Sequence, residues 1–338
     1  MAPTTPHRRS NLGTPDLLLS DNVLSLRSRG ALRDDTKTYR EDKQLIDLVM
    51  RQKPLSKYRA YWSCADIKRA GSGVLVKKDI DVVSVRRGLT RPGESHEEGR
   101  VLLLEFANSV LLNTYAQNNG WTAESMAKRR RWDAELRSFL VGDSEVTRAA
   151  GPDGRVKPLV WTGDLNACHR EVDVTHPSFF LNQKPEGKKG GAPPPPPEDP
   201  DDRGQPGFTV NERRRFDDIV VAAGLVDAYR LLHGDAERRM TWFGHPGVVQ
   251  VGKYRGKGMR LDYFFVDDAL ARRVVACEQA TDGIPDGEML ERPDRAFFGS
   301  DHCAVYMRLR EERAREGEGE KKKVADEGGA ERTEGRRD

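Results

Sequence analysis

The chain has 338 residues, enough for one large domain or two ordinary ones. It carries 57 Lys and Arg against 54 Asp and Glu, a formal net charge of +3, so its charge permits a nucleic-acid partner without requiring one. No run of about 18 apolar residues is present, so we expect no membrane-spanning helix. Four widely spaced cysteines argue against a disulfide framework or a zinc ribbon and fit a reducing compartment.

Three segments lack a folding pattern. Residues 1–16 are rich in Pro, Thr, Ser and Arg, and residues 311–338 are charged and rich in Gly, so we expect both to be disordered. Residues 183–206 contain five consecutive prolines, Pro193–Pro197, which exclude a helix or a central strand. We expect a passive surface insertion with polyproline II character here, rather than a docking site for an SH3-like partner, and no packed apolar face within it. It would interrupt a single domain of residues 17–310.

Between these segments the pattern is mixed. Short apolar runs predict strands, in chain order, at Gly73–Val76, Val82–Val85, Val101–Phe106, Val110–Tyr115, Pro158–Thr162, Leu261–Val266 and Cys303–Leu309. Apolar residues near helical spacing predict helices at Ala123–Val141 and Val210–Ala223. Strands outnumber helices and several are hairpin candidates. The pattern therefore predicts an α+β or layered α/β/α architecture with sheets as the core.

Three polar clusters lie at the ends of predicted strands. The first offers a carboxylate base and an amide donor that would share one face of an extended chain. The second places an Arg and an Asp on one face of a strand, and the third places a carboxylate beside an imidazole, which can hold a metal or orient the ring. Each alone has a plain structural explanation, such as a turn or an exposed ion pair. The clusters are Asp164 with Asn166, Arg260 with Asp262, and Asp301 with His302.

Taken in order, the clusters resemble the exonuclease III family of apurinic/apyrimidinic (AP) endonucleases, within the endonuclease/exonuclease/phosphatase superfamily. The resemblance runs from about residue 61 to about residue 309, apart from the proline-rich segment. It implies a DNase I-like fold, a four-layered α/β sandwich with two packed sheets. Further segments that resemble the family are Tyr61–Cys64, Glu97–Arg100, Asn113–Tyr115 with Asn118, Arg131–Asp133, Gly207–Thr209 and Thr241–Trp242.

The resemblance implies cleavage of the phosphodiester 5′ to an abasic site in duplex DNA, with 3′-phosphodiesterase or 3′→5′ exonuclease activity as a further capability. It implies Mg²⁺ as the cofactor, with Mn²⁺ as a substitute. The implied catalytic residues are Tyr115, Asp164, Asn166, Asp262 and His302. The implied metal ligands are Asn22, Asp35, Asp164, Asn166, Asp301 and His302. The implied DNA contacts are Asn118, Trp242, Met259 and Arg260.

The resemblance also implies a role for each catalytic side chain. Asp164 would orient or deprotonate the attacking water, or protonate a leaving oxygen, and Asn166 would hold that Asp or stabilise the developing charge. His302 would contact the scissile phosphate, while Asp262 would set the protonation and orientation of the imidazole. Tyr115 would donate to a phosphate oxygen.

The N-terminal part departs from the family pattern. Asp35 stands where the family has its metal-binding Glu, and Leu24 replaces a carboxylate or amide near Asn22. Only 12 residues separate Asn22 from Asp35, too few for the helix and strand that the family places there, so a core element is missing or replaced. Met259 stands where the family has Trp, and Ala304 where it has Pro.

Three functions therefore stay open. The first is a Mg²⁺-dependent AP endonuclease, the second a catalytically weakened relative that binds DNA or a protein, and the third another phosphoesterase of the superfamily. The Gly-Phe-Thr and Thr-Trp segments argue against the third, since the family grips DNA there. We expect a monomer without membrane contact that acts on duplex DNA with abasic sites in the nucleus, or alternatively in the mitochondrion.

Overall fold

The computed structural model describes residues 17–20, 48–64, 71–89, 96–142, 150, 154–185, 191–244, 253–279 and 301–310. The predicted disordered ends, residues 1–16 and 311–338, lie outside the described residues. So do two of the predicted metal ligands, Asn22 and Asp35. Among the described helices, none combines the length and apolar composition needed to cross a bilayer.

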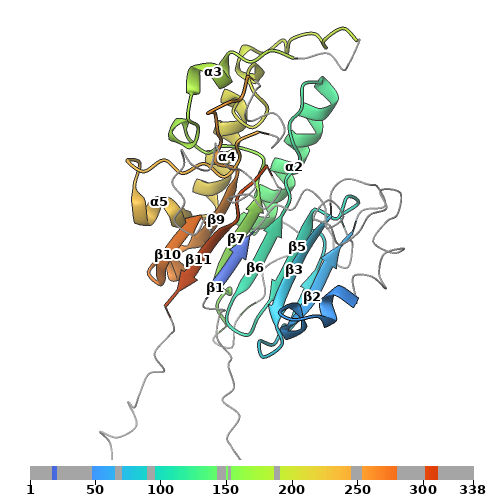
Figure 1. The fold of residues 1–338 in the computed structure, drawn as a ribbon, viewed down its shortest axis with the longest axis vertical. Helices are drawn as coiled ribbons and strands as arrows, with labels where there is room; N and C mark the ends of the chain where they lie inside the picture. Colours follow the sequence, from blue (N-terminus) through green and yellow to red (C-terminus); the bar gives the residue numbers. More distant parts are fainter. Residues whose placement is uncertain are drawn as a thin grey trace, which may run out of the picture.

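The largest sheet has six strands in the order β4-β5-β6-β7-β9-β8 (Figure 1). Strand β6 runs parallel to β7, whereas β9 runs antiparallel to β7. The carboxyl ends of β6 and β7 and the amino end of β9 therefore meet at one edge of the sheet. The strands are β4 (Ser84–Arg86), β5 (Val101–Glu105), β6 (Val110–Thr114), β7 (Leu159–Asp164), β8 (Leu225–Asp227) and β9 (Asp262–Asp267).

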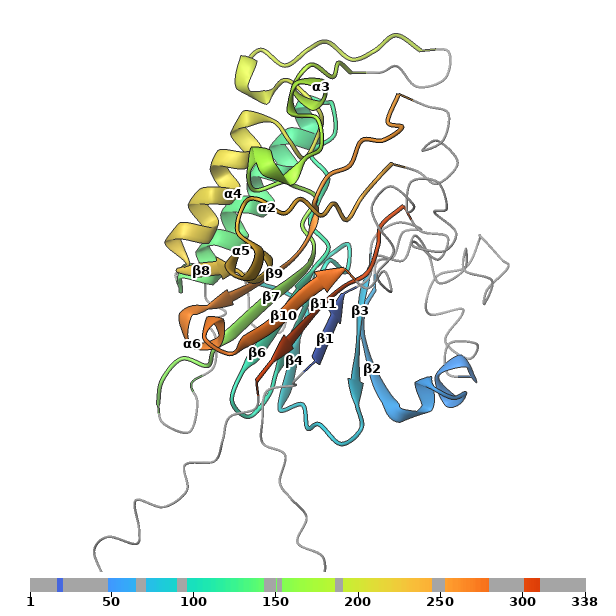
Figure 2. The ribbon, with the colours of Figure 1, turned by 60° about the vertical axis from the view of Figure 1, so that its left-hand side comes forward.

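Two helices, α2 (Ala123–Val141) and α4 (Val210–Ala222), pack against each other and cover one face of this sheet (Figures 1 and 2). Their apolar side chains meet the strands in one core. The residues that form this core include Trp132, Phe139, Phe216 and Ile219 of the helices and Leu112, Trp161 and Phe265 of the sheet.

Both helices begin where the sequence pattern predicts because their first turns are capped. The Thr122 hydroxyl accepts from the backbone N–H of Ser125, and the Thr209 hydroxyl accepts from that of Glu212, each within a capping box. Helix α2 ends at Gly142, whose φ of 90° is the left-handed conformation that favours glycine at a helix end.

The opposite face of the six-stranded sheet packs against a second layer of strands (Figure 2). This layer contains a three-stranded sheet in the order β1-β11-β10 and a β2-β3 hairpin. The described residues thus supply three of the four predicted layers. The strands are β1 (Leu17–Ser20), β2 (Tyr58–Ser63), β3 (Ser72–Lys77), β10 (Val274–Gln279) and β11 (Val305–Leu309). The shorter helices are α3 (Pro177–Leu181), α5 (Ala228–His233), α6 (Asp268–Ala271), and the 3₁₀ turns Leu55–Lys57, Glu171–Asp173 and Pro200–Asp202.

All the predicted strands and helices are confirmed, and their ends differ from the predicted ones by at most two residues. Strands β2, β8 and β10 were not predicted. Strand β2 mixes aromatic and polar side chains, β8 has three residues, and β10 carries polar residues on a sheet edge. Strand β1 (Leu17–Ser20), which the sequence pattern did not predict, pairs antiparallel with β11.

The proline-rich segment divides into an extended run and a packed end. Pro193–Pro197 form neither helix nor strand and lie mostly exposed in the coil at the top of Figure 1. Asp202, by contrast, is 4% exposed and forms an ion pair with Arg130 of α2. Pro206 is buried as well. The prediction that residues 183–206 offer no packed apolar face is therefore wrong at Pro206, where the chain folds back onto the domain.

Candidate functional site

Four of the predicted site residues meet at the edge where β6 and β7 end. Tyr115 follows β6 and Asp164 ends β7, while Asp262 begins β9 and is the direct pairing partner of Asp164. His302 precedes β11 in the other layer, and its Nδ1 lies 2.8 Å from Asp262 Oδ2. These residues are distant in sequence, and they meet because the directions of β6, β7 and β9 bring the ends that carry them to one edge of the sheet.

The chain turns sharply after β7. Asn166 has a φ of 48°, and its backbone N–H donates to Asp164 Oδ1 over 2.9 Å. Its side-chain Nδ2 donates to Asp164 Oδ2 (3.2 Å) and to the carbonyl of Ala116 (2.9 Å). Of the two arrangements that the sequence left open, the shared face of an extended chain and a turn, the turn forms, and it places the amide against the carboxylate. Exposed Asn118 donates to Asn166 Oδ1 over 3.2 Å.

A glycine makes this turn compatible with the neighbouring strand. Gly163 has a φ of 124°, and a Cβ at this position would lie 2.0 Å from the carbonyl oxygen of Thr114. Any side chain would therefore force β6 and β7 apart next to the site.

Burial and mutual charge set the protonation of the central residues. Burial raises the pKa of Asp164 to about 7; nearby His302 opposes this shift and Asp262 adds to it. Burial alone would lower the pKa of His302, but the Asp262 and Asp164 carboxylates outweigh it and raise the pKa to about 10. Burial, followed by the Asp164 charge, raises the pKa of Tyr115. Near neutral pH the imidazole is therefore a cation and the phenol remains a hydrogen-bond donor.

The same group offers a place for a cation. Ligand atoms of Asp164, Asp262 and His302 all lie within 4.8 Å of one another. The Oδ1 atoms of Asp262 and Asp301 are buried and have no hydrogen-bond partner among the described residues. The other oxygen of Asp301 accepts from Trp242 Nε1 over 3.1 Å. Carboxylate oxygens with unused acceptor capacity fit a hard divalent metal ion, whereas the imidazole beside them, as a cation, would not ligate it.

The four predicted DNA contacts separate into two pairs. Asn118 is exposed and Trp242 half-buried at the rim of the site. Met259 is 1% exposed and packs with Phe180 and other apolar residues. Arg260 is 3% exposed. Burial removes both of these side chains from the surface, so the structure corrects the prediction that Met259 and Arg260 contact DNA.

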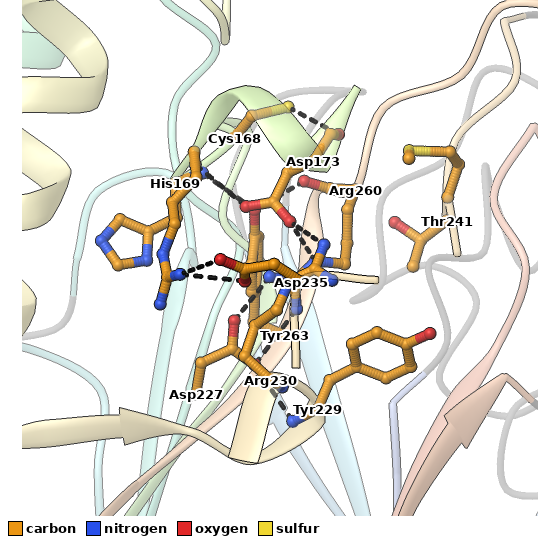
Figure 3. A network of polar contacts seen from close by, with 12 residues as sticks. Cys168, His169, Asp173, Asp227, Tyr229, Arg230, Asp235, Thr241, Arg260 and Tyr263 are labelled. Atoms are coloured by element: carbon orange, nitrogen blue, oxygen red, sulfur yellow. Dashed lines mark hydrogen bonds and ion pairs between the residues drawn. The ribbon is translucent and has the colours of Figure 1, made fainter. Parts of the chain in front are cut away.

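Arg260 instead belongs to a buried ion-pair network (Figure 3). Its Nε donates to Asp173 Oδ1 over 2.9 Å, and its two terminal nitrogens pair with the two oxygens of Asp227 at 3.1 and 2.5 Å. Arg230 reaches the same Asp173 oxygen at 2.5 Å. The plain structural explanation of an exposed ion pair between Arg260 and Asp262 therefore does not hold either, because the partners of Arg260 come from distant parts of the sequence and are buried with it.

A second arginine, which the sequence patterns did not single out, joins the two loops of the site. Buried Arg129 of α2 donates to the carbonyl oxygens of Gln117 (2.6 Å), Leu165 (3.1 Å) and Asn166 (3.3 Å). Asp133, one helical turn further along, accepts from its Nε over 2.8 Å. The signal that could have revealed Arg129 is an Arg–Asp pair spaced by four residues within the apolar stripe of a helix.

A third arginine supports Tyr115. The guanidinium of Arg100 lies over the Tyr115 ring, 4.6 Å from its centroid, and donates to the Tyr115 carbonyl oxygen over 3.0 Å. Glu98 accepts from Arg100 and from Lys128. Burial alone would raise the pKa of Glu98, but these two cations outweigh it and lower the pKa to about 2. The Glu-Gly-Arg turn therefore holds a phenol that faces the site.

Comparison with known proteins gives a consistent assignment. A family model described as the endonuclease/exonuclease/phosphatase family matches residues 38–302. A DNA-(apurinic or apyrimidinic site) endonuclease of Arabidopsis thaliana is 42% identical over 283 residues, which cover 82% of this chain and 70% of that protein. A protein of the same description from Plasmodium falciparum (isolate 3D7) is 32% identical over 303 residues. That match covers 85% of this chain and 45% of the relative, so this chain spans less than half of the Plasmodium protein.

A solved structure supports the fold. The crystal structure of an AP endonuclease from Leishmania major aligns with a TM-score of 0.58, at 22% identity and over 88% of each chain. At this identity the likeness concerns the fold, which is the two-layered packing of sheets described above. Together, the family match and the 42% identical relative show that the chain belongs to the endonuclease/exonuclease/phosphatase family, in its exonuclease III-like branch of AP endonucleases.

Proposed function

We propose that the protein is a Mg²⁺-dependent AP endonuclease that cleaves the phosphodiester 5′ to an abasic site in duplex DNA. The observation that carries the proposal is the convergence of Asp164, Asp262 and His302, whose ligand atoms lie within 4.8 Å at one sheet edge. The 42% identity to the Arabidopsis AP endonuclease supports the choice of substrate. Removal of blocking groups from 3′ ends is a further activity that we propose for the same site.

In the proposed reaction a water molecule attacks phosphorus while the bond to the sugar oxygen on the opposite side breaks, and the released oxygen takes a proton from a neighbouring water. Asp164 is placed to take the proton of this water, because burial raises its pKa to about 7. The Asn166 amide, which donates to Asp164 Oδ2, keeps that carboxylate in one orientation.

Two further side chains would stabilise charge on the phosphate. His302 is a cation whose Nδ1 is held by the 2.8 Å hydrogen bond to Asp262, and its Nε2 would donate to a phosphate oxygen. The Tyr115 phenol, whose raised pKa keeps it protonated, would donate to a second oxygen. Both donors are positioned before substrate arrives, so little reorganisation is needed during the reaction.

The divalent cation would be held by oxygens of Asp164, Asp262 and Asp301. When bound there, it would neutralise charge on the phosphate and keep several waters in place. The buried Oδ1 atoms of Asp262 and Asp301, which have no partner among the described residues, are the acceptors that make this site suitable.

The proposal predicts incision of a duplex that carries a tetrahydrofuran abasic analogue, in the presence of Mg²⁺ and not of excess EDTA. An undamaged duplex of the same sequence is the control. A protein that hydrolyses inositol phosphates and cuts neither this duplex nor a 3′-phosphoglycolate end would instead be another phosphoesterase. Binding of the tetrahydrofuran duplex without incision would point to the weakened relative.

The pH dependence of incision should follow the ionisation of Asp164 and His302, whose pKa values are both raised. Activity should rise with pH through about 7 as Asp164 loses its proton, and fall through about 10 as His302 loses its own. Cations compete with protons for a carboxylate, so more Mg²⁺ should move the lower limb to lower pH. Rates measured from pH 5 to pH 11 at two Mg²⁺ concentrations test this. If the acidic limb of the pH–rate profile does not shift with Mg²⁺ concentration, Asp164 is not a ligand of the cation.

A further inference from the structure

Asp262 and His302 lie in different layers of the fold. Asp262 begins β9 of the six-stranded sheet, whereas His302 precedes β11 of the three-stranded sheet, and β9 and β11 are not hydrogen-bonded neighbours. The pair therefore needs a connection other than the sheet ladders.

The segment Thr241–Phe243 provides this connection. On one side, the backbone N–H of Trp242 donates to the carbonyl oxygen of Met259 over 2.8 Å, and the N–H of Met259 donates back over 2.8 Å. On the other side, the N–H of Cys303 donates to the carbonyl oxygen of Thr241 over 2.8 Å. The segment thus forms a short antiparallel spacer between the chain that precedes Asp262 and the chain that carries His302.

One side chain of the spacer reaches the catalytic strand directly. The Thr241 hydroxyl accepts from the backbone N–H of Leu261 (2.9 Å) and from that of Asp262 (3.1 Å), and the residue is 2% exposed. In Figure 3 Thr241 stands to the right of Arg260, the residue two positions before Asp262. Through its hydroxyl, Thr241 holds the backbone of Asp262, and through its carbonyl it holds the residue that follows His302.

We propose that Thr241 is a positioning residue that sets the distance between Asp262 and His302. The kinetic test of this inference, which measures incision, rests on the proposed function. The crystallographic test, which measures the Asp262–His302 distance, does not depend on it. Removing the hydroxyl would deprive two buried amides of the acceptor seen in this structure, and such donors are costly to leave unsatisfied. The start of β9 would then shift or admit water, and a small displacement is enough to break the 2.8 Å contact between Asp262 and His302.

The test uses two substitutions at Thr241 and one matched control. Thr241→Val keeps the shape and removes the acceptor, whereas Thr241→Ser keeps the acceptor. Thr162→Val is the control, because Thr162 is also buried and its hydroxyl also bonds the backbone of β9, at the Tyr263 carbonyl (2.8 Å), without touching Asp262 or His302.

We expect Thr241→Val to lower kcat for incision about 10- to 100-fold with KM within about threefold of the parent. Thr241→Ser and Thr162→Val should stay within about threefold of the parent in both constants. In crystal structures, the separation of His302 Nδ1 from Asp262 Oδ2 should widen in Thr241→Val and stay near 2.8 Å in Thr241→Ser. Circular dichroism checks that all three variants fold.

Several results would overturn the inference. They are a parent-like kcat for Thr241→Val, an equal loss in Thr241→Ser, an equal loss in Thr162→Val, and an unchanged separation in the Thr241→Val crystal structure. A parent that cleaves no DNA would refute the proposed function instead. The crystallographic comparison would then still decide whether Thr241 sets the Asp262–His302 distance.

Discussion

Replacing His302 by alanine should reduce the rate of incision at a tetrahydrofuran site by on the order of 10³-fold or more. The change removes the cationic donor to the phosphate. It also leaves the Asp164 and Asp262 carboxylates close together without the charge between them, which disfavours the ionised form of Asp164. Single-turnover incision at saturating protein is the measurement, because it separates the chemical step from DNA binding.

A second histidine serves as the matched control. His233 of α5 also contacts a carboxylate, with its Nδ1 3.1 Å from Glu237, but it lies outside the cluster that forms the site. His233→Ala should therefore incise within about threefold of the parent. If the parent itself is no faster than His302→Ala, the chain is not a nuclease and the DNA-binding relative becomes the better interpretation.

The sequence singled out the candidate site residues because their side chains leave a visible pattern. Asp164, Asp262 and His302 each stand where an apolar run begins or ends, and the order of these clusters resembles one family. The structure places all three at the edge that the directions of β7 and β9 create. Local pattern was sufficient here because each side chain lies at a strand end, and the fold then assembles those ends.

The supporting residues were less visible for a physical reason. Thr241 and Arg129 act on backbone amides and carbonyls, which every residue possesses, so their partners leave no mark in the sequence. Arg260 was misread because its partners, Asp173 and Asp227, stand 87 and 33 residues away and lie in a short turn and a short strand. Such pairings depend on how layers pack, which a local pattern does not contain.

The burial of these charges predicts a large effect on stability. Asp173→Asn should lower the free energy of unfolding by about 3–5 kcal/mol. Asp173 is 0% exposed, and its Oδ1 holds Arg230 and Arg260, whose side chains are 4% and 3% exposed. A neutral amide would leave Arg230 without its carboxylate partner in this network and Arg260 with Asp227 alone, and a buried guanidinium without sufficient counter-charge is costly. Urea unfolding followed by circular dichroism measures the difference.

An exposed ion pair in the same region is the matched control. Arg170 pairs with Asp235 at 3.0 Å, but the two side chains are 47% and 61% exposed, so Asp235→Asn should change the stability by no more than about 1 kcal/mol. Burial alone would raise the pKa of Asp173, whereas Arg260 and Arg230 outweigh it and lower the pKa below its usual 3.8. Its contribution should therefore be complete above about pH 4 and disappear as the pH falls further.

This acid dependence distinguishes the network from ordinary packing. If Asp173 stabilises the fold through charge, the difference between the parent and Asp173→Asn should shrink as the pH falls below about 4, because the carboxyl of the parent then becomes neutral too. If the difference in the free energy of unfolding stays constant through that range, the amide destabilises the fold through its packing or hydrogen bonds and not through the loss of charge. Arg260 directly precedes Leu261 and Asp262, so a charge-dependent loss would also show that the start of the catalytic strand is held by electrostatics.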